Sequence, residues 1–159
     1  MNMKKLPLSE LIEEIIETHH KFLREELPSL LDLLEKVITQ EGSNFPKLHD
    51  LKKVFVAFFI DVNAHLTREE NILFPLIFRA HTQKLTAHVA QLRNLIAIME
   101  EEHDKIDQEI DQMREIYLSL SSAPSSLQGL IKRFVALEED MRQHTHKENE
   151  ILFPKALTF

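Results

Sequence analysis

His65-Leu-Thr-Arg-Glu69 runs into Asn71-Ile-Leu-Phe-Pro75, and the same pattern returns where His144-Thr-His-Lys-Glu148 runs into Glu150-Ile-Leu-Phe-Pro154. Each copy places an imidazole and a carboxylate four residues apart, the spacing that stacks two side chains on one face of a helix. Imidazole binds iron, zinc, copper and nickel, and a carboxylate can bridge two metal ions. The repeat therefore predicts a helical protein with a two-metal site.

The composition predicts one nearly all-helical domain. The chain has 159 residues, enough for a single substantial core, with only 2 Gly and no Trp. We therefore expect residues 1–159 to form one domain. Cysteine is absent, so this sequence offers no disulfide, no thiolate metal ligand and no iron–sulfur cluster of its own.

Charge and hydropathy argue against two classes of partner. The net charge of -7, with no stripe of Lys and Arg, argues against nucleic acid. The longest apolar run, residues 54–60, is too short to span a bilayer, and no apolar segment follows Lys4 and Lys5 as in a secretory signal. We expect a cytoplasmic protein with neither a nucleic-acid nor a membrane partner.

Apolar residues at helical spacing predict four long helices joined by short loops. Their expected ranges are about 9–39, 46–75, 92–120 and 127–154. The stretch 76–85 is expected to turn the chain, and each Ile-Leu-Phe-Pro tag to pack and then stop its helix. This pattern predicts an all-α, up-down-up-down four-helix bundle.

The histidines divide equally between two predicted hairpins. His20 and His65 lie at nearly equal distances from the turn near residue 43, and His103 and His144 at nearly equal distances from Ala123. Each half thus offers one His from its first helix at the level of the His-x-x-x-Glu on its second. We interpret the chain as a duplicated hairpin, about 9–75 and 88–154.

All four of these histidines fall on apolar helix faces, where a buried imidazole needs partners for both ring nitrogens. Carboxylates one turn before each histidine are the predicted hydrogen-bond partners that would orient the rings. These are Glu17, Asp61, Glu100 and Asp140. The other histidines are expected to be solvated or to face away from the bundle interior; they are His19, His49, His81, His88 and His146.

A second arrangement is also compatible with the spacing. Glu17-x-x-His20 and Glu100-x-x-His103 match the Glu-x-x-His pattern of ferritin-like di-iron proteins, in which both glutamates would bind metal. His65 and His144 would then have no role. Substitution of His65 distinguishes the two arrangements.

Together the motifs resemble the hemerythrin-type cation-binding domain. More narrowly, His20-Lys-Phe-Leu-Arg-Glu-Glu-Leu-Pro28, Met99-Glu-Glu-Glu-His103 and the two tags resemble the Repair of Iron Centres family of di-iron proteins. The resemblance implies two oxo- or hydroxo-bridged iron ions and a role in repairing iron–sulfur proteins or handling nitric oxide, O2 or peroxide under stress. The ligands that it implies are His20, His65, Glu69, His103, His144 and Glu148.

The sequence departs from these families at three points. Members of the repair family often carry an N-terminal domain with a cysteine pair, which this sequence does not show. The residues between Pro75 and His103 exceed the usual length, and we interpret them as an extended connection. Oxygen-carrying hemerythrins use a fifth His, and here Met99 and Asp107 stand at those positions. A reversible oxygen carrier or sensor therefore ranks second, and a purely structural bundle third. The protein is expected to be a monomer or a homodimer.

Overall fold

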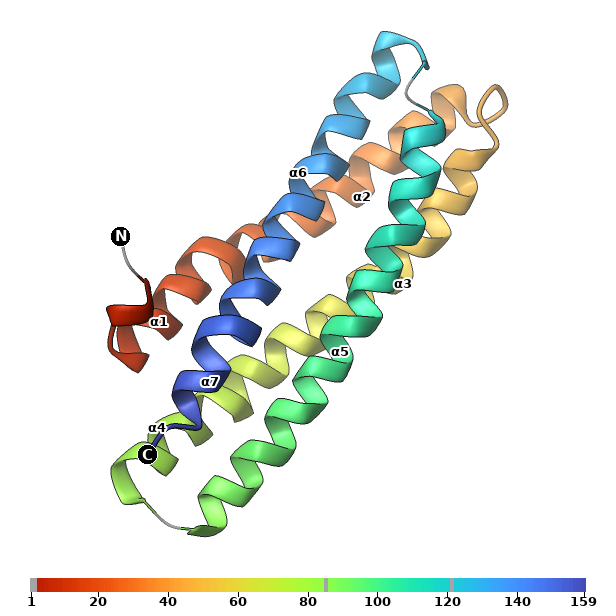
Figure 1. Cartoon of the computed structure of the whole chain (residues 1–159). Coiled ribbons are helices and arrows are strands. Elements are labelled where there is room, and N and C mark those ends of the chain that lie inside the picture. Colours follow the sequence, from red (N-terminus) through yellow and green to blue (C-terminus); the bar gives the residue numbers. More distant parts are fainter. Residues whose placement is uncertain (1–2, 85, 121) are drawn as a thin grey trace.

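The computed structural model describes residues 3–84, 86–120 and 122–159 (Figure 1). These residues form four long helical segments, three of which contain a five-residue π-helical turn. The segments are Leu8–Ile15 (α1), Ile16–His20 (η2) and Lys21–Glu41 (α2); Lys47–Arg68 (α3), Glu69–Leu73 (η3) and Phe74–Gln83 (α4); Thr86–Ser119 (α5); and Ser125–Lys147 (α6), Glu148–Leu152 (η4) and Phe153–Ala156 (α7). A 3₁₀ turn, Met3–Lys5 (η1), precedes them.

The four segments run alternately up and down, as expected from the sequence (Figure 1). α3 packs along α5, α2 contacts both α3 and α6, and α5 contacts α6, so the helices close into a ring. Both ends of the chain lie at the same end of the bundle, opposite the connections between α2 and α3 and between α5 and α6. The predicted all-α four-helix bundle is confirmed.

The prediction that the Ile-Leu-Phe-Pro tags stop their helices was wrong. The helix continues beyond Pro75 as α4, and the stretch 76–85, expected to be a turn, is helical as far as Gln83. Lys84 then takes the left-handed conformation (φ 51°) that commonly ends a helix. The extra length before His103 is therefore helix on both sides of a short connection, and not an extended loop.

The buried apolar side chains fall into two separate clusters. The first fills the interior between α2, α3, the second half of α5 and α6, and includes Leu34, Phe55 and Leu130. The second lies between α1, α4, the first half of α5 and α7, and includes Ile15 and Ile77. The buried histidines, together with Glu69 and Glu148, belong to neither cluster and lie on the helices between them.

Phe134 joins three helices within the first cluster. Its ring lies edge-on to Phe55 with centroids 5.3 Å apart, and it stacks on Tyr117 at 6.2 Å. Phe134→Leu should cost about 1–2 kcal/mol of unfolding free energy because it removes ring contacts and leaves a partial cavity. Urea titration measures this, and the exposed neighbour Val135→Ala should change stability by less than about 0.5 kcal/mol. Equal losses in the two variants would contradict the packing described.

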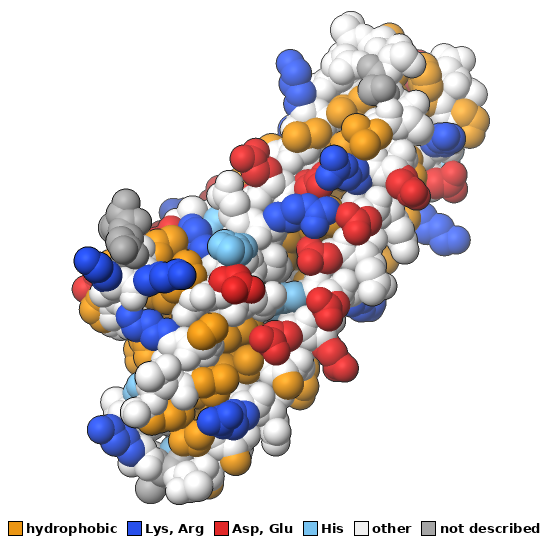
Figure 2. All heavy atoms as spheres, viewed as in Figure 1, with side chains coloured by type: hydrophobic (Ala, Val, Ile, Leu, Met, Phe, Trp, Pro, Cys, Tyr) orange, Lys and Arg blue, Asp and Glu red, His pale blue; other side chains and the backbone are white. Residues whose placement is uncertain are grey.

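The surface carries both signs of charge. On the face in Figure 2, Asp and Glu side chains gather over the middle of the bundle with a few Arg and Lys among them, and no continuous basic stripe is seen. Among the described residues, no helix combines the length and apolar character needed to cross a bilayer.

Candidate metal centre

Three π-helical turns place functional residues in the bundle interior. His20 ends η2, Glu69 begins η3 and Glu148 begins η4. In the last two turns the backbone N–H of Phe74 or Phe153 donates five residues back, to the carbonyl of the glutamate. A proline follows each Phe; it lacks an N–H and its ring crowds the carbonyl four residues earlier, and a wider turn relieves that conflict.

Six buried side chains meet in the middle of the bundle. They form two groups that share the two glutamates: His20 with His144, and His65 with His103. Within the first pair the Nε2 atoms are 3.1 Å apart, and within the second 3.0 Å. The structure therefore brings together all six residues identified from the repeat and the resemblance.

Each glutamate reaches both imidazole pairs. Glu69 Oε2 lies 3.3 Å from His20 Nε2, and its Oε1 lies 3.2 Å from His65 Nε2. Glu148 Oε1 lies 3.0 Å from His144 Nε2, and its Oε2 lies 3.1 Å from His103 Nε2. One oxygen of each carboxylate thus faces each pair, as a carboxylate that bridges two cations requires.

The outer ring nitrogens of three histidines are held by polar side chains. His20 Nδ1 lies 2.9 Å from Glu70, His65 Nδ1 lies 2.9 Å from Glu102, and His103 Nδ1 lies 2.8 Å from Asn149. A carboxylate can only accept, so Nδ1 of His20 and His65 carries the proton, and their Nε2 lone pairs point inward. Hydrogen bonds of this kind orient metal-binding histidines.

This arrangement fits metal ions better than it fits an empty core. All four carboxylate oxygens of Glu69 and Glu148 are buried and lack a hydrogen-bond donor within the described chain. Buried charges without partners are costly, and two Nε2 lone pairs that face each other repel unless a cation or proton lies between them. Neighbouring ligand atoms about 3 Å apart correspond to metal–ligand bonds of about 2.1 Å at right angles. The six residues can therefore hold two ions.

The two carboxylates govern the protonation of the histidines. Burial, the largest influence, lowers the pKa of His20, but the nearby Glu148 and Glu69 outweigh it and raise the pKa to about 10. The same balance of burial against Glu69 raises the pKa of His65 to about 10. His144 differs, because burial prevails there and lowers its pKa. Without metal the site compensates its two carboxylates with protons on imidazole.

None of the four predicted orienting carboxylates contacts the histidine that it precedes, and Asp140 pairs with His19 instead of His144. Glu17 is 66% exposed and pairs with Lys21, and Glu100 is exposed too, so neither reaches a histidine of the cluster. Asp61 pairs with Lys105 at 2.6 Å. The exposure of both glutamates also removes the ferritin-like arrangement, which required them as ligands. Their place is taken by Glu70, Glu102 and Asn149, which follow a glutamate or precede a histidine of the cluster.

His19 was expected to face away from the interior, and this was wrong. Its side chain is 1% exposed, and its Nδ1 lies 2.9 Å from Asp140 Oδ1. Its ring stacks on His144, with centroids 5.5 Å apart and planes 20° apart. The cause is the π-helical turn Ile16–His20, whose extra residue shifts the helical phase and turns both His19 and His20 inward.

The remaining histidines lie outside the cluster. His49 and His146 are exposed, as expected. His81 was expected to be solvated, but its Nε2 lies 2.8 Å from the carbonyl oxygen of Ala156 and its ring stacks on Phe159. His88 is half-buried.

Glu109 is a buried carboxyl outside the centre. It is 8% exposed, and burial together with its hydrogen bond to Asp61 raises its pKa to about 7. The folded protein therefore keeps a proton that the unfolded chain loses above its ordinary value of 4.5, so this residue weakens stability as pH rises from 4.5 through 7.

Glu109→Gln should remove that weakness, because an amide cannot ionise. At pH 8 we expect the variant to be about 1–2 kcal/mol more stable than the parent, after allowance for solvent screening at Asp61, with a smaller gain at pH 5. Urea unfolding at both pH values measures it, with the exposed Glu115→Gln as control. A gain that does not change with pH would contradict the assignment.

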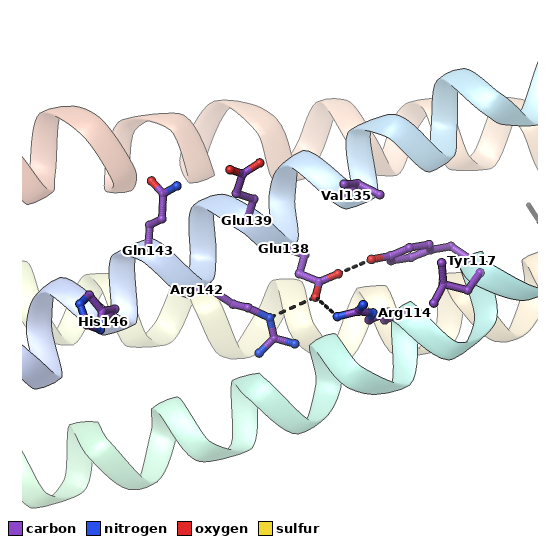
Figure 3. Close-up of a pocket in the computed structure, with 9 residues that line it drawn as sticks. Arg114, Tyr117, Val135, Glu138, Glu139, Arg142, Gln143 and His146 are labelled. Atoms are coloured by element: carbon purple, nitrogen blue, oxygen red, sulfur yellow. Dashed lines mark hydrogen bonds and ion pairs between the residues drawn. The ribbon is translucent and has the colours of Figure 1, made fainter.

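A groove of about 680 Å³ lies between α5 and α6, away from the centre (Figure 3). Four of its polar side chains pair with one another, because Glu138 accepts hydrogen bonds from Arg114, Arg142 and Tyr117. None of the six cluster residues lines this groove. The centre is therefore enclosed by side chains on this side of the bundle.

Comparison with known proteins agrees with the geometry. A protein-family model described as the hemerythrin HHE cation binding domain matches residues 11–156. Two proteins named iron-sulfur cluster repair protein YtfE, from Yersinia pestis (strain Pestoides F) and Yersinia pseudotuberculosis serotype O:1b (strain IP 31758), are each 30% identical over 154 residues. The match covers 95% of this chain and 66% of each relative, so the chain spans just under two thirds of their length. The resemblance inferred from the sequence is confirmed.

Proposed function

The chain belongs to the hemerythrin HHE cation-binding family, and on that premise we propose that it holds two iron ions and serves the repair of iron–sulfur proteins. The observation that carries the proposal is the pair of buried carboxylates, each of which reaches both imidazole pairs and has, among the described residues, no donor other than those imidazoles. Imidazole and carboxylate together suit iron, and the absence of cysteine leaves no thiolate to select a softer metal.

Each residue has a distinct task in this proposal. His20 and His144 would hold one ion, and His65 and His103 the other. Glu69 and Glu148 would bridge them, and their negative charge would offset that of the metal. Ferrous iron with an open position supplies binding and electron transfer toward O2, peroxide or nitric oxide. Two six-coordinate ions offer about twelve positions, of which the protein fills eight, so small molecules can compete for the others.

The missing fifth histidine supports repair over oxygen transport. Met99, at one position where oxygen carriers have a fifth His, is fully buried in the second apolar cluster, and Asp107, at the other, is half-buried near Arg142. The centre is thus left with four inward imidazole nitrogens. The two relatives carry iron–sulfur repair in their names, and we propose that role, through iron delivery or removal of nitric oxide, for this chain.

Metal content, measured together with the absorption spectrum, tests the first part. Protein from iron-supplemented cells should contain about two irons per chain and show a near-ultraviolet band that bleaches on reduction. The loaded protein should then transfer iron to an apo iron–sulfur protein, or react with nitric oxide. Zinc alone, or no metal, would overturn the di-iron proposal. A di-iron protein inactive in both assays would overturn only the repair role, and a stable, reversible oxygen adduct would indicate oxygen binding instead.

A further inference from the structure

The hydrogen bonds to the outer ring nitrogens of the cluster histidines follow the same pattern in both hairpins. In each hairpin, the residue after the bridging glutamate binds Nδ1 of the first-helix histidine. Glu70 does this for His20 at 2.9 Å, and Asn149 does it for His103 at 2.8 Å. Each pair of ligands therefore has an outer hydrogen bond at its first-helix histidine.

The second-helix histidines do not share such support. Glu102, which precedes His103, lies 2.9 Å from His65 Nδ1 and is itself paired with Arg68. The corresponding residue before His20 is His19. It lies against His144 as a stacked ring, 5.5 Å between centroids, and its Nδ1 pairs with Asp140 instead.

His144 consequently lacks an outer partner. Its Nδ1 is buried, and no hydrogen bond within the described chain reaches it; the same holds for the Nε2 of His19. A carboxylate or amide at this outer position raises the donor strength of a metal-binding imidazole and fixes its orientation. Loss of such a partner typically costs about 10–100-fold in metal affinity.

We propose that the two metal positions differ in strength, and that the ion held by His20 and His144 is the exchangeable one. His19 is the positioning residue that sets this difference, because it stands where the other hairpin has Glu102 and provides no hydrogen bond to His144. This inference rests on the proposed two-ion centre and adds which ion leaves first. After one ion leaves, His65, His103, Glu69 and Glu148 would still hold the other, so the interior would retain one cation beside its two buried carboxylates.

Release of iron to a ferrous chelator tests the proposal on the full chain loaded with two ions. The parent should release the ions in two phases of one ion each, with rates that differ about 10–100-fold. His19→Gln should slow the fast phase toward the slow one. Its amide oxygen can accept from His144 Nδ1, as Asn149 does from His103, while its amide N–H₂ donates to Asp140. His19→Phe keeps a stacked ring without a hydrogen bond, and should leave the fast phase unchanged.

Two further measurements locate the ion that remains after the fast phase and test whether the position held by His65 and His103 can be weakened in turn. Anomalous diffraction from crystals of protein taken after the fast phase should place the remaining ion between His65 and His103. Glu102→Ala should speed the slow phase about 10-fold or more, because it leaves His65 Nδ1, like His144 Nδ1, without a hydrogen-bond partner. A single phase in the parent, a remaining ion between His20 and His144, or no change with His19→Gln would overturn the inference. The two-ion centre would stand in all three cases, since each requires two bound ions; a chain that binds none would overturn both.

Discussion

Replacement of His65 by alanine should lower the iron content from about two ions per chain to one or fewer. His65 Nε2 lies 3.2 Å from Glu69 and 3.0 Å from His103 Nε2. Alanine therefore removes the proposed metal ligand that lies beside these two residues. Loss of a ligand should weaken the affinity of that position about 100-fold or more, a larger effect than loss of an outer partner. The near-ultraviolet band should fall with the metal content. Metal analysis and titration with ferrous iron under anaerobic conditions measure the change.

A matched control lies on the same helix. His49 is exposed near the start of α3, and its alanine variant should keep two irons and an unchanged spectrum. Circular dichroism should show that both variants remain helical. Full iron content and an unaltered spectrum in the His65 variant would contradict the assignment of His65 as a ligand and favour a site built without this histidine.

Chelation of the metal should lower the melting temperature of the parent protein by at least about 10 °C. Each ion that binds only the folded state contributes about 4 kcal/mol when its free concentration exceeds the dissociation constant a thousandfold. For a chain of this length, about 1 kcal/mol corresponds to 2–4 °C. Without metal, Glu69 and Glu148 also repel each other inside the bundle. Calorimetry with and without chelator measures the shift.

The double variant Glu69→Gln with Glu148→Gln supplies the comparison. It removes both bridging charges, so its melting temperature should not respond to chelator. Without metal it should melt no higher than the metal-free parent, because it also removes the partners of His20 and His65, whose pKa values these carboxylates raise to about 10. If chelator leaves the melting temperature of the parent protein unchanged, metal binding at the cluster does not stabilise the folded state.

Apolar residues at helical spacing were enough to predict the bundle. The duplicated His-x-x-x-Glu pattern, together with His20 and His103 at the same level, singled out the six residues that the structure brings together. Their spacing fixes a face of each helix, and short connections fix the antiparallel order, so the inward imidazoles fall at one level. Both are local properties of the sequence, and they hold whatever the details of packing.

The sequence was less informative about what surrounds the cluster. Glu70, Glu102 and Asn149 act across helices, and such contacts depend on how far each helix is rotated about its axis. His19 was misplaced for a related reason: a regular helix turns it about 100° from His20, whereas the π-helical turn allows both rings to face inward. A proline after Ile-Leu-Phe was the one available signal of such turns, and we interpreted it as a helix stop.

The division of the apolar interior into two clusters has a consequence for how the molecule opens. Each cluster is a packed unit of its own, and what lies between them is a layer of polar side chains. Helices that cross such a layer remain continuous, but side-chain packing does not carry cooperativity across it. Ions held as proposed would bind ligands from all four helical segments and connect the two units, so amide hydrogens at both ends should then exchange through the same opening. Without them, the end formed by α1, α4 and α7 can open while the other end stays folded.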